Sequence, residues 1–514
     1  MRLLNVDKSQ VRTLALAVVF LLSGSFVHAW GAPGGAPAPD IVATKNGTVK
    51  GVVNDTTITF FGIPFARPPV ANLRWQPPQA ASSWTGTRDA SQFGSRCPQT
   101  TPLPANENED CLFLNVYKPR ISAIKLPVMV WIYGGANVQG SADIYNPTPL
   151  VDTGKVIAVT INYRIGALGF IAHPALDKEN HPFANYGIMD QQLALTWVKN
   201  NIQAFGGDPA NVTIFGESAG GLNVLSHLIS PASKGLFKNA ISESGAYELD
   251  TPTLAASEAL GTAFANQVGC TAQTAACLRA LSVATILANQ GPGGTGGAQG
   301  AAHNQSTIDG KILPESQRSA FKAGRFNKVS TLLGANKDEG LIFVAPNITA
   351  DAYAQFAGAL AARAGKDPAA ALAEYPLANY PSPYFAAAAL LGDSSFACSA
   401  RQVSQIISTK VPTYEYEFID NGGAGGVATH GSEIQYLMNT IAGGPADLPA
   451  VSQELATTMR KYWTQFAKTG NPNAVTTPLW SKYQNYQDVL QYLQAPTPSV
   501  TSDYAVRHHC GFWG

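Results

Sequence analysis

The stretch that decides the fold reads Val212-Thr213-Ile214-Phe215-Gly216-Glu217-Ser218-Ala219-Gly220-Gly221. β-Branched and aromatic residues, which favour a buried strand, run directly into Gly-x-Ser-x-Gly, and a helix-compatible segment follows at 222–228. A serine between a strand and a helix is typical of a nucleophile elbow, a turn so sharp that the hydroxyl is exposed. Gly216 and Gly220 flank the serine because a Cβ at either place would collide with a neighbouring strand or helix.

The Gly-x-Ser-x-Gly motif is not specific by itself. The chain contains 48 glycines in 514 residues, so a chance match is expected in roughly one chain in four of this composition. Only the strand–turn–helix context raises the motif above chance. The rest of the chain must therefore supply an acid, a base and an oxyanion hole.

Length, composition and charge bound the kind of protein. Hydrophobic residues make up 45% of the chain and charged residues only 13%, which is typical of a globular protein with a large core. The formal net charge is zero, and no cluster of Lys and Arg resembles a nucleic-acid footprint, so we expect no nucleic-acid partner. No internal repeat or linker divides the mature chain, and we expect residues 30–514 to form a single domain.

The first 29 residues have the pattern of a signal peptide. An apolar run at 14–22 precedes Val27-His28-Ala29, a small-x-small cleavage site. Three basic residues precede the run: Arg2, Lys8 and Arg12. The run is short for a membrane span, so we expect residues 1–29 to be removed and the protein to be exported, periplasmic or secreted, without stable membrane insertion. An uncleaved membrane anchor is the alternative.

The cysteines point to disulfides rather than to a metal site. All six lie beyond the signal peptide: Cys97, Cys111, Cys270, Cys277, Cys398 and Cys510. An even number in an oxidising compartment favours disulfide bonds, although six cysteines allow fifteen pairings. The shortest loops would be closed by Cys97 with Cys111 and by Cys270 with Cys277. That would leave Cys398 and Cys510 to pair with each other. Cys-x-x-Cys and His/Cys zinc spacings are both missing from the sequence, so we expect no metal.

Strands alternate with helical segments, which predicts an α/β fold with a large, mostly parallel central sheet, helices on both faces and inserted loops. Apolar β-branched runs mark the expected strands, at 112–117, 126–133, 156–163, 212–217, 239–244, 329–334 and 413–418. Helical spacing marks 186–205 and 352–373, and alternation at 42–61 predicts a small antiparallel hairpin system. The Gly-rich run 291–300 predicts an open surface loop or a loop at a pocket rim.

A serine at this elbow needs a base, and chain order selects one histidine. In hydrolases of this architecture the acid and then the histidine follow the serine. His430 follows the expected strand 413–418 in a flexible Gly-rich loop, where such a base belongs. The other histidines precede Ser218, lie on its helix, fall in the Gly-rich run or lie near the C-terminus: His28, His173, His181, His227, His303, His508 and His509. A surface histidine is the alternative reading of His430.

The acid is expected at the end of a strand between the serine and the histidine. The stretch 332–340 ends such a strand with two adjacent carboxylates, Asp338 and Glu339. The residues alone do not decide between them. An ordinary solvated acidic turn is the alternative for both.

An oxyanion hole needs backbone N–H groups aimed at the developing negative charge. One is expected from the residue after the serine, Ala219. Others are expected from the loop after an earlier strand, where Gly134-Gly135-Ala136 lets the backbone approach a substrate closely. A plain turn is the alternative.

Together these motifs resemble the type-B carboxylesterase/lipase family, which includes the cholinesterases. Glu-Asp-Cys-Leu-Phe-Leu-Asn-Val at 109–116 closely resembles a second signature of that family. The resemblance runs in order from about residue 62 to residue 513 and also includes the stretches at 134–136, 162–170, 215–221, 336–340, 430–434 and 466–472.

The resemblance implies an α/β-hydrolase fold and a triad that needs no cofactor. It assigns Ser218 as the nucleophile, His430 as the base and Glu339 as the acid. It further implies oxyanion donors at Gly135, Ala136 and Ala219, support of the acid by Ser244, an Arg74–Glu109 salt bridge, and the disulfides Cys97–Cys111, Cys270–Cys277 and Cys398–Cys510.

Departures from the family pattern bear on specificity. Ala136 stands where many members have a third glycine, but a backbone N–H is all that the hole requires. The segment 98–110 is short and has no tryptophan, whereas cholinesterases have a longer loop there with a tryptophan that binds quaternary ammonium groups. A choline-ester specialist is therefore not expected. The run 291–300 falls where relatives place acyl-pocket aromatics, which predicts a roomy acyl side.

The sequence thus predicts a secreted serine carboxylesterase that cleaves small-molecule carboxylic esters through an acyl-enzyme on Ser218. A lipase acting on long acyl chains is the alternative within the enzymes, although no amphipathic lid is recognisable at 98–110. An inactive adhesion or binding module of the same fold is the alternative from another class.

Overall fold

The computed structural model describes residues 39–100, 106–121, 125–291, 303–420, 422, 426–485 and 487–514. These residues belong to one compact unit. The predicted signal peptide at 1–29 and the Gly-rich run, apart from Gly291, lie outside the described residues, as does 101–105 of the segment in which no lid was recognised.

Within the described residues, eleven strands form the main sheet in the order β16-β15-β13-β12-β11-β10-β7-β9-β6-β4-β3. The seven strands from β15 to β9 are parallel, and the strands added at either edge are antiparallel. The bounds are β3 Val52–Val53, β4 Thr57–Pro64, β6 Phe113–Pro119, β7 Leu126–Ile132, β9 Ile157–Ile161, β10 Gly207–Glu217, β11 Asn239–Glu243, β12 Ser330–Asn336, β13 Thr413–Phe418, β15 Leu490–Leu493 and β16 Ser499–Thr501. The predicted mostly parallel sheet is confirmed.

Two smaller sheets accompany the main one. The N-terminal hairpin β1 Ile41–Thr44 and β2 Gly47–Lys50 is antiparallel, and β5 Thr87–Asp89 joins it. A second pair consists of β8 Tyr145–Asn146 and β14 Asn439–Thr440.

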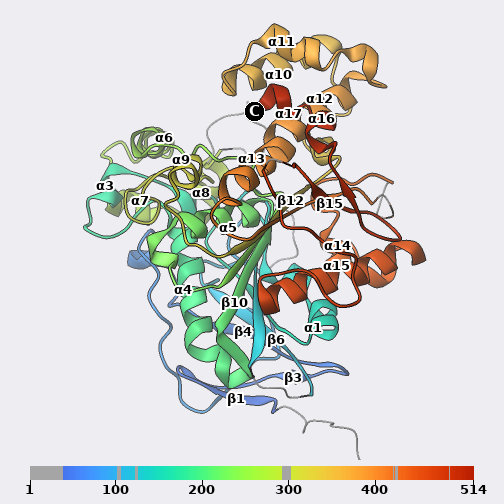
Figure 1. Cartoon of the computed structure of the whole chain (residues 1–514). Coiled ribbons are helices and arrows are strands. Elements are labelled where there is room, and N and C mark those ends of the chain that lie inside the picture. Colours follow the sequence, from blue (N-terminus) through green and yellow to red (C-terminus); the bar gives the residue numbers. More distant parts are fainter. Residues whose placement is uncertain are drawn as a thin grey trace, which may run out of the picture. The chain divides into compact units, whose positions relative to one another are not determined.

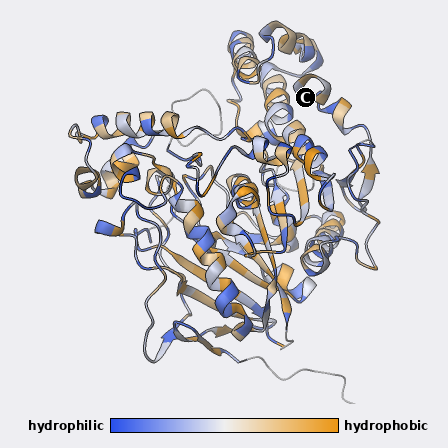
Figure 2. Cartoon of the chain, turned by 60° about the vertical axis from the view of Figure 1, so that its left-hand side comes forward, coloured by the Kyte–Doolittle hydropathy of each residue, from blue (hydrophilic) through white to orange (hydrophobic). Residues whose placement is uncertain are grey.

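Helices cover both faces of the main sheet (Figure 1). One face carries α4 Tyr186–Asn201, α5 Ala219–Ile229, α9 Gln317–Ala323 and α13 Cys398–Ile407, and the other carries α1 Thr148–Gly154, α14 Ile434–Leu437 and α15 Ala450–Thr469. The central strands are strongly hydrophobic (Figure 2) because both of their faces are buried under helices.

The remaining helices lie in the insertions between strands and in the C-terminal tail. They are α2 Gly166–Phe170, α3 Pro174–Asp177, α6 Leu254–Gln267, α7 Ala275–Ala280, α8 Val283–Asn289, α10 Ala350–Arg363, α11 Pro368–Glu374, α12 Pro383–Leu391, α16 Tyr504–Arg507 and α17 Cys510–Trp513. A 3-10 turn, Glu339–Ile342, follows β12, and a π-helix, Gly392–Ala397, joins α12 to α13.

The single helix predicted at 352–373 is wrong, because the structure has two helices there. Gly365 adopts a left-handed φ of +67° after α10 ends. The Asp367 side chain then accepts hydrogen bonds from the backbone at the start of α11, and Pro368 occupies its first turn. A proline lacks the N–H that a continuous helix needs at that point, but it fits the first turn of a new one.

Three disulfides are present in the structure: Cys97–Cys111, Cys270–Cys277 and Cys398–Cys510. The Arg74–Glu109 ion pair is present too, with Nη2 and Oε2 2.6 Å apart. Arg74 also donates to the carbonyls of Arg279 and Leu281, so this pair fixes the first disulfide loop against the helical insertion. Among the described residues, no helix has the length and apolar character needed to cross a membrane.

Candidate active site

Ser218 occupies a strained turn between β10 and α5. Its φ of 55° and ψ of −124° are unfavourable for a residue with a Cβ, and α5 begins at the next residue. A Cβ on Gly216 would lie 2.5 Å from the carbonyl oxygen of Ile132, and one on Gly220 only 1.9 Å from the same atom. The turn therefore requires glycine on both sides of the serine, as the motif predicts.

The Gly-Gly-Ala loop lies beside this serine. A Cβ on Gly134 would come within 2.9 Å of the Ser218 Cβ. Gly135 and Ala136 both have left-handed φ values, 103° and 54°. Their carbonyls are engaged away from the serine, since Gly135 O accepts from the backbone of Val138 and Ala136 O accepts from a side-chain amide.

The N–H groups of Gly135, Ala136 and Ala219 donate no hydrogen bond to any residue that the structure describes. Ala219 is the first residue of α5, where the N–H has no partner within the helix. All three groups are thus free to bind a ligand oxygen.

Asn137 supports this loop and was not anticipated from the sequence. Its side chain is buried, accepts a hydrogen bond from Asn223 Nδ2 at 2.9 Å and donates to the Asn304 carbonyl at 3.1 Å. Asn304 in turn donates to Ala136 O at 2.9 Å. A polar residue directly after Gly-Gly-Ala is the only signal that the sequence offers for this role.

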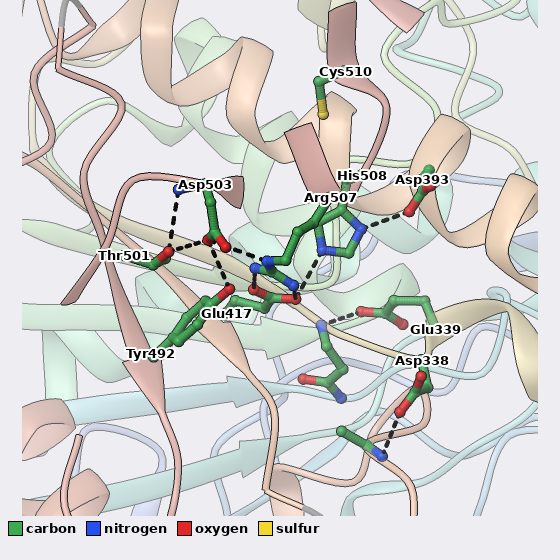
Figure 3. Close-up of polar contacts among 12 residues, drawn as sticks. Asp338, Glu339, Asp393, Glu417, Tyr492, Thr501, Asp503, Arg507, His508 and Cys510 are labelled. Carbon is green, nitrogen blue, oxygen red and sulfur yellow. Dashed lines mark hydrogen bonds and ion pairs between the residues drawn. The ribbon is translucent and has the colours of Figure 1, made fainter. Parts of the chain in front are cut away.

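His430 and Glu339 form a buried pair. His430 Nδ1 lies 2.5 Å from Glu339 Oε2, and the other carboxylate oxygen accepts from Ser244 Oγ at 2.5 Å and from the Asn336 N–H at 2.6 Å. Asp338 points elsewhere, to the backbone N–H of Ala428 (Figure 3). Of the two carboxylates that the residues alone left open, Glu339 is therefore the one that faces the imidazole.

A third carboxylate faces the other edge of the imidazole. Glu217 Oε1 lies 3.1 Å from His430 Nε2, although the atoms are not aligned for a hydrogen bond. Burial alone lowers the pKa of His430, but the carboxylates of Glu217 and Glu339 outweigh it and raise the pKa to about 9. Burial raises the pKa of Glu217 to about 7, although the positive charge of a protonated His430 opposes this rise.

Among the described residues, the Ser218 hydroxyl makes no hydrogen bond to His430. The imidazole Nε2 has no hydrogen-bond partner and faces the residue directly before the serine. The described part of the chain also contains no group of three or more His, Cys, Asp or Glu side chains that could hold a metal ion.

Comparison with known proteins assigns the chain to a family. The sequence profile of the carboxylesterase family matches residues 38–513. The chain belongs to the carboxylesterase family. Its α/β sheet is thus an α/β-hydrolase fold, and the protein is a carboxylic ester hydrolase.

Several curated carboxylesterases are about one-third identical to this one. The fumonisin B1 esterase of Sphingopyxis macrogoltabida is 34% identical, over 93% of this chain and 92% of its own length. The para-nitrobenzyl esterase of Bacillus subtilis (strain 168) is 35% identical, over 84% and 90% respectively. The mouse pyrethroid hydrolase Ces2a is 34% identical, over 93% and 91%.

Aromatic rings hold the imidazole of this carboxylesterase in place. Phe343 and Phe396 lie against His430, with ring centroids 4.9 and 5.0 Å away. The two phenylalanines are themselves parallel, with centroids 5.7 Å apart. Phe343 directly follows the 3-10 turn that begins at Glu339, and Phe396 lies on the π-helix, so neither could be linked to His430 from sequence spacing.

Two more glutamates are buried near the pair. Glu243 accepts from Trp463 Nε1 at 2.9 Å, and Glu433 accepts from Asn336 Nδ2 at 2.5 Å. Burial raises the pKa of Glu243 to about 8 and the pKa of Glu433 well above its usual value. In both cases burial favours the neutral form of the carboxyl.

Proposed function

We propose that this carboxylesterase is an exported serine esterase that cleaves small-molecule carboxylic esters through an acyl-enzyme on Ser218. The observation that carries the proposal is the buried His430–Glu339 pair, whose Nε2 makes no hydrogen bond and lies 3.1 Å from Glu217, the residue directly before Ser218 in the strained turn. A base held at Nδ1 by a carboxylate presents Nε2 to a nucleophile, which is the arrangement that activates serine.

The proposed reaction has two halves. The Ser218 hydroxyl attacks the ester carbonyl while His430 Nε2 accepts its proton, and the imidazolium then protonates the departing alcohol. Water then attacks the acyl carbonyl while His430 accepts its proton, and the imidazolium returns that proton to the serine oxygen as the carboxylic acid leaves. The hydroxyl-to-imidazole hydrogen bond is needed only in the substrate complex, where such contacts tighten in many hydrolases.

The oxyanion of each tetrahedral intermediate is proposed to bind the N–H groups of Gly135, Ala136 and Ala219. Their freedom from other partners supports this role. Glu339 is proposed to stabilise the imidazolium, with Ser244 and the Asn336 backbone fixing the carboxylate. No nucleic-acid or cofactor partner is part of the proposal.

Hydrolysis of a p-nitrophenyl ester series by the wild type, Ser218→Ala and Ser83→Ala tests the proposal. Ser83 is exposed and serves as the matched serine control. We expect Ser218→Ala to lower kcat by a factor of roughly 10³ or more, because it removes the nucleophile, while Ser83→Ala leaves kcat unchanged. Undiminished turnover by Ser218→Ala would contradict the mechanism.

The same series separates the alternative functions. A maximum at short acyl chains in solution supports the esterase. A rate that rises only with long chains above their solubility limit would favour a lipase. Tight binding of a protein partner without turnover of any ester would favour an adhesion module.

Export is proposed from the predicted signal peptide at 1–29, and the three disulfides support an oxidising compartment. Mass spectrometry of protein recovered from the periplasm or the medium is expected to show an N-terminus at Trp30. A retained Met1 would contradict cleavage.

A further inference from the structure

A histidine in the C-terminal tail is buried far from the reacting atoms along the chain but is connected to them in space. His508 Nδ1 lies 2.6 Å from Asp393 Oδ1, and Nε2 lies 2.8 Å from Glu417 Oε1. Figure 3 shows the imidazole between the two carboxylates. His508 is only 5% exposed and Glu417 is fully buried.

The contacts of His508 require a charged imidazole. Both ring nitrogens meet a carboxylate oxygen, and only the imidazolium can donate from both. The second oxygen of each carboxylate also has a partner. Arg507 binds that of Glu417, and the Tyr375 hydroxyl donates to that of Asp393. Burial alone lowers the pKa of His508, but the hydrogen bonds to the two carboxylates raise it to about 9.

Asp393 belongs to the π-helix Gly392–Ala397, which contacts the acid–base pair twice. A Cβ on Gly392 would lie in ordinary contact with Glu339, 3.7 Å from its Cβ. Four residues later, Phe396 packs on the His430 ring. π-Turns within helices recur at functional sites, because the extra residue places side chains that a regular helix cannot.

Glu417 anchors the other end of this connection to the sheet. It lies on β13, where it pairs with Ala335 of β12, and the next pair along joins Phe418 to Asn336. The Asn336 N–H is itself a donor to Glu339. His508 thus links two elements that lie next to Glu339. One is the π-helix, and the other is the β12–β13 strand pair that precedes Glu339 in the chain.

The Cys398–Cys510 disulfide holds the C-terminal tail next to the π-helix. Cys398 is the residue after the π-helix, and Cys510 lies two residues beyond His508. The tail is therefore tied covalently to the same segment that His508 holds through Asp393.

We propose that His508 is a positioning residue for ester hydrolysis: by bridging Asp393 and Glu417 it holds the π-helix so that Phe396 keeps the His430 imidazole against Glu339. This inference rests on the proposed function of His430 and Glu339.

The test compares His508→Gln with His509→Gln in the full mature enzyme. His509 is the next residue, is partly exposed and contacts Glu374 and the Tyr375 ring, so its substitution perturbs the same tail while leaving both carboxylate contacts of His508 in place. We expect His508→Gln to lower kcat about tenfold with KM changed less than twofold, because a small displacement of the base slows the chemical steps. The acid limb of kcat/KM is expected to move to lower pH, since a looser Glu339 contact stabilises the imidazolium less. His509→Gln is expected to match the wild type in both.

A double-mutant cycle with Phe396→Leu tests the route of the effect. If His508 acts through Phe396, the double variant loses no more kcat than Phe396→Leu alone. Losses that simply multiply would overturn the proposal. Should His508→Gln not fold, Asp393→Asn replaces it, because its amide oxygen still accepts from Nδ1 while the charge is lost. Wild-type kcat and an unmoved acid limb in Asp393→Asn would also overturn it.

Labelling with diethyl p-nitrophenyl phosphate separates this proposal from the proposed function. A wild type that is not labelled stoichiometrically at Ser218 would refute the serine mechanism itself. A wild type that is labelled and active, with a His508→Gln variant of equal kcat, would refute only the positioning role.

Discussion

Glu217 shows how a single side chain within a signature can set the electrostatics of a site. It occupies the position before the serine, at the end of the buried half of β10. A charge in such a place is costly unless it is paired, and its partner is the His430 ring. The same carboxylate stabilises the imidazolium, which opposes the proposed use of His430 as a base at low pH.

Glu217→Gln is expected to move the acid limb of kcat/KM to lower pH by roughly one to two units. The carboxylate raises the pKa of His430 by favouring its charged form, so its removal lowers that pKa and leaves the base neutral, and active, at lower pH. The measurement is a pH–rate profile of ester hydrolysis. Glu315→Gln, which removes a glutamate paired with Arg325 at the surface, serves as the control and is expected to leave the profile unchanged. An unmoved or rising acid limb in Glu217→Gln would contradict the assignment.

At the scale of elements, the elbow depends on the closeness of α5 to β7. The first turn of the helix passes so near the end of that strand that no side chain fits at Gly220. The obstacle is the backbone carbonyl of Ile132, which cannot change rotamer to make room. The strain of Ser218 persists because strand and helix are both fixed by burial on all sides.

Gly220→Ala is expected to lower the free energy of unfolding by roughly 3 kcal/mol or more, because the new methyl meets the backbone of Ile132 and Tyr133. Gly358→Ala is the matched control. Gly358 lies in α10, where a Cβ would make only an ordinary 3.5 Å contact with Pro368, and we expect a gain of about 0.5–1 kcal/mol. Urea unfolding of both variants measures the difference. Equal stabilities would contradict the close-approach argument.

At the scale of the whole molecule, the described chain has a second hydrophobic cluster besides the main core. It gathers the helices α10 to α12 with the C-terminal tail and includes Tyr375, Leu390 and Trp513. Trp513 Nε1 donates to the Tyr375 hydroxyl, which itself donates to Asp393. The tail therefore joins this cluster to the π-helix beside the site.

Removal of the Cys398–Cys510 disulfide is expected to cost more stability than removal of Cys270–Cys277. The first closes a loop of 112 residues and the second one of only 7. Loop-closure entropy gives about 5 against about 2.5 kcal/mol for the paired Cys→Ser variants. Urea unfolding of each double variant under oxidising conditions is the measurement. A larger loss for the short loop would contradict an entropic origin.

The sequence by itself determined the features that depend on neighbouring residues. Local patterns predict the strand before Gly216, the need for glycine around Ser218 and the places of the parallel strands along the chain. Chain order then selects His430 among the histidines. Nearly every predicted strand appears within two residues of its expected bounds. The reason is that a parallel strand buried under helices on both faces must be apolar along its length, so its sequence stands out from the polar loops around it.

Only the tertiary structure decided which side chains meet. The turn after β12 aims Glu339 at the imidazole and Asp338 at a backbone N–H, a choice that two adjacent carboxylates in a sequence do not reveal. The contacts of Glu217, Phe396 and His508 bring together segments up to hundreds of residues apart. Their energies come from burial and from charges at close range, and both exist only once the sheet, the π-helix and the tail have packed.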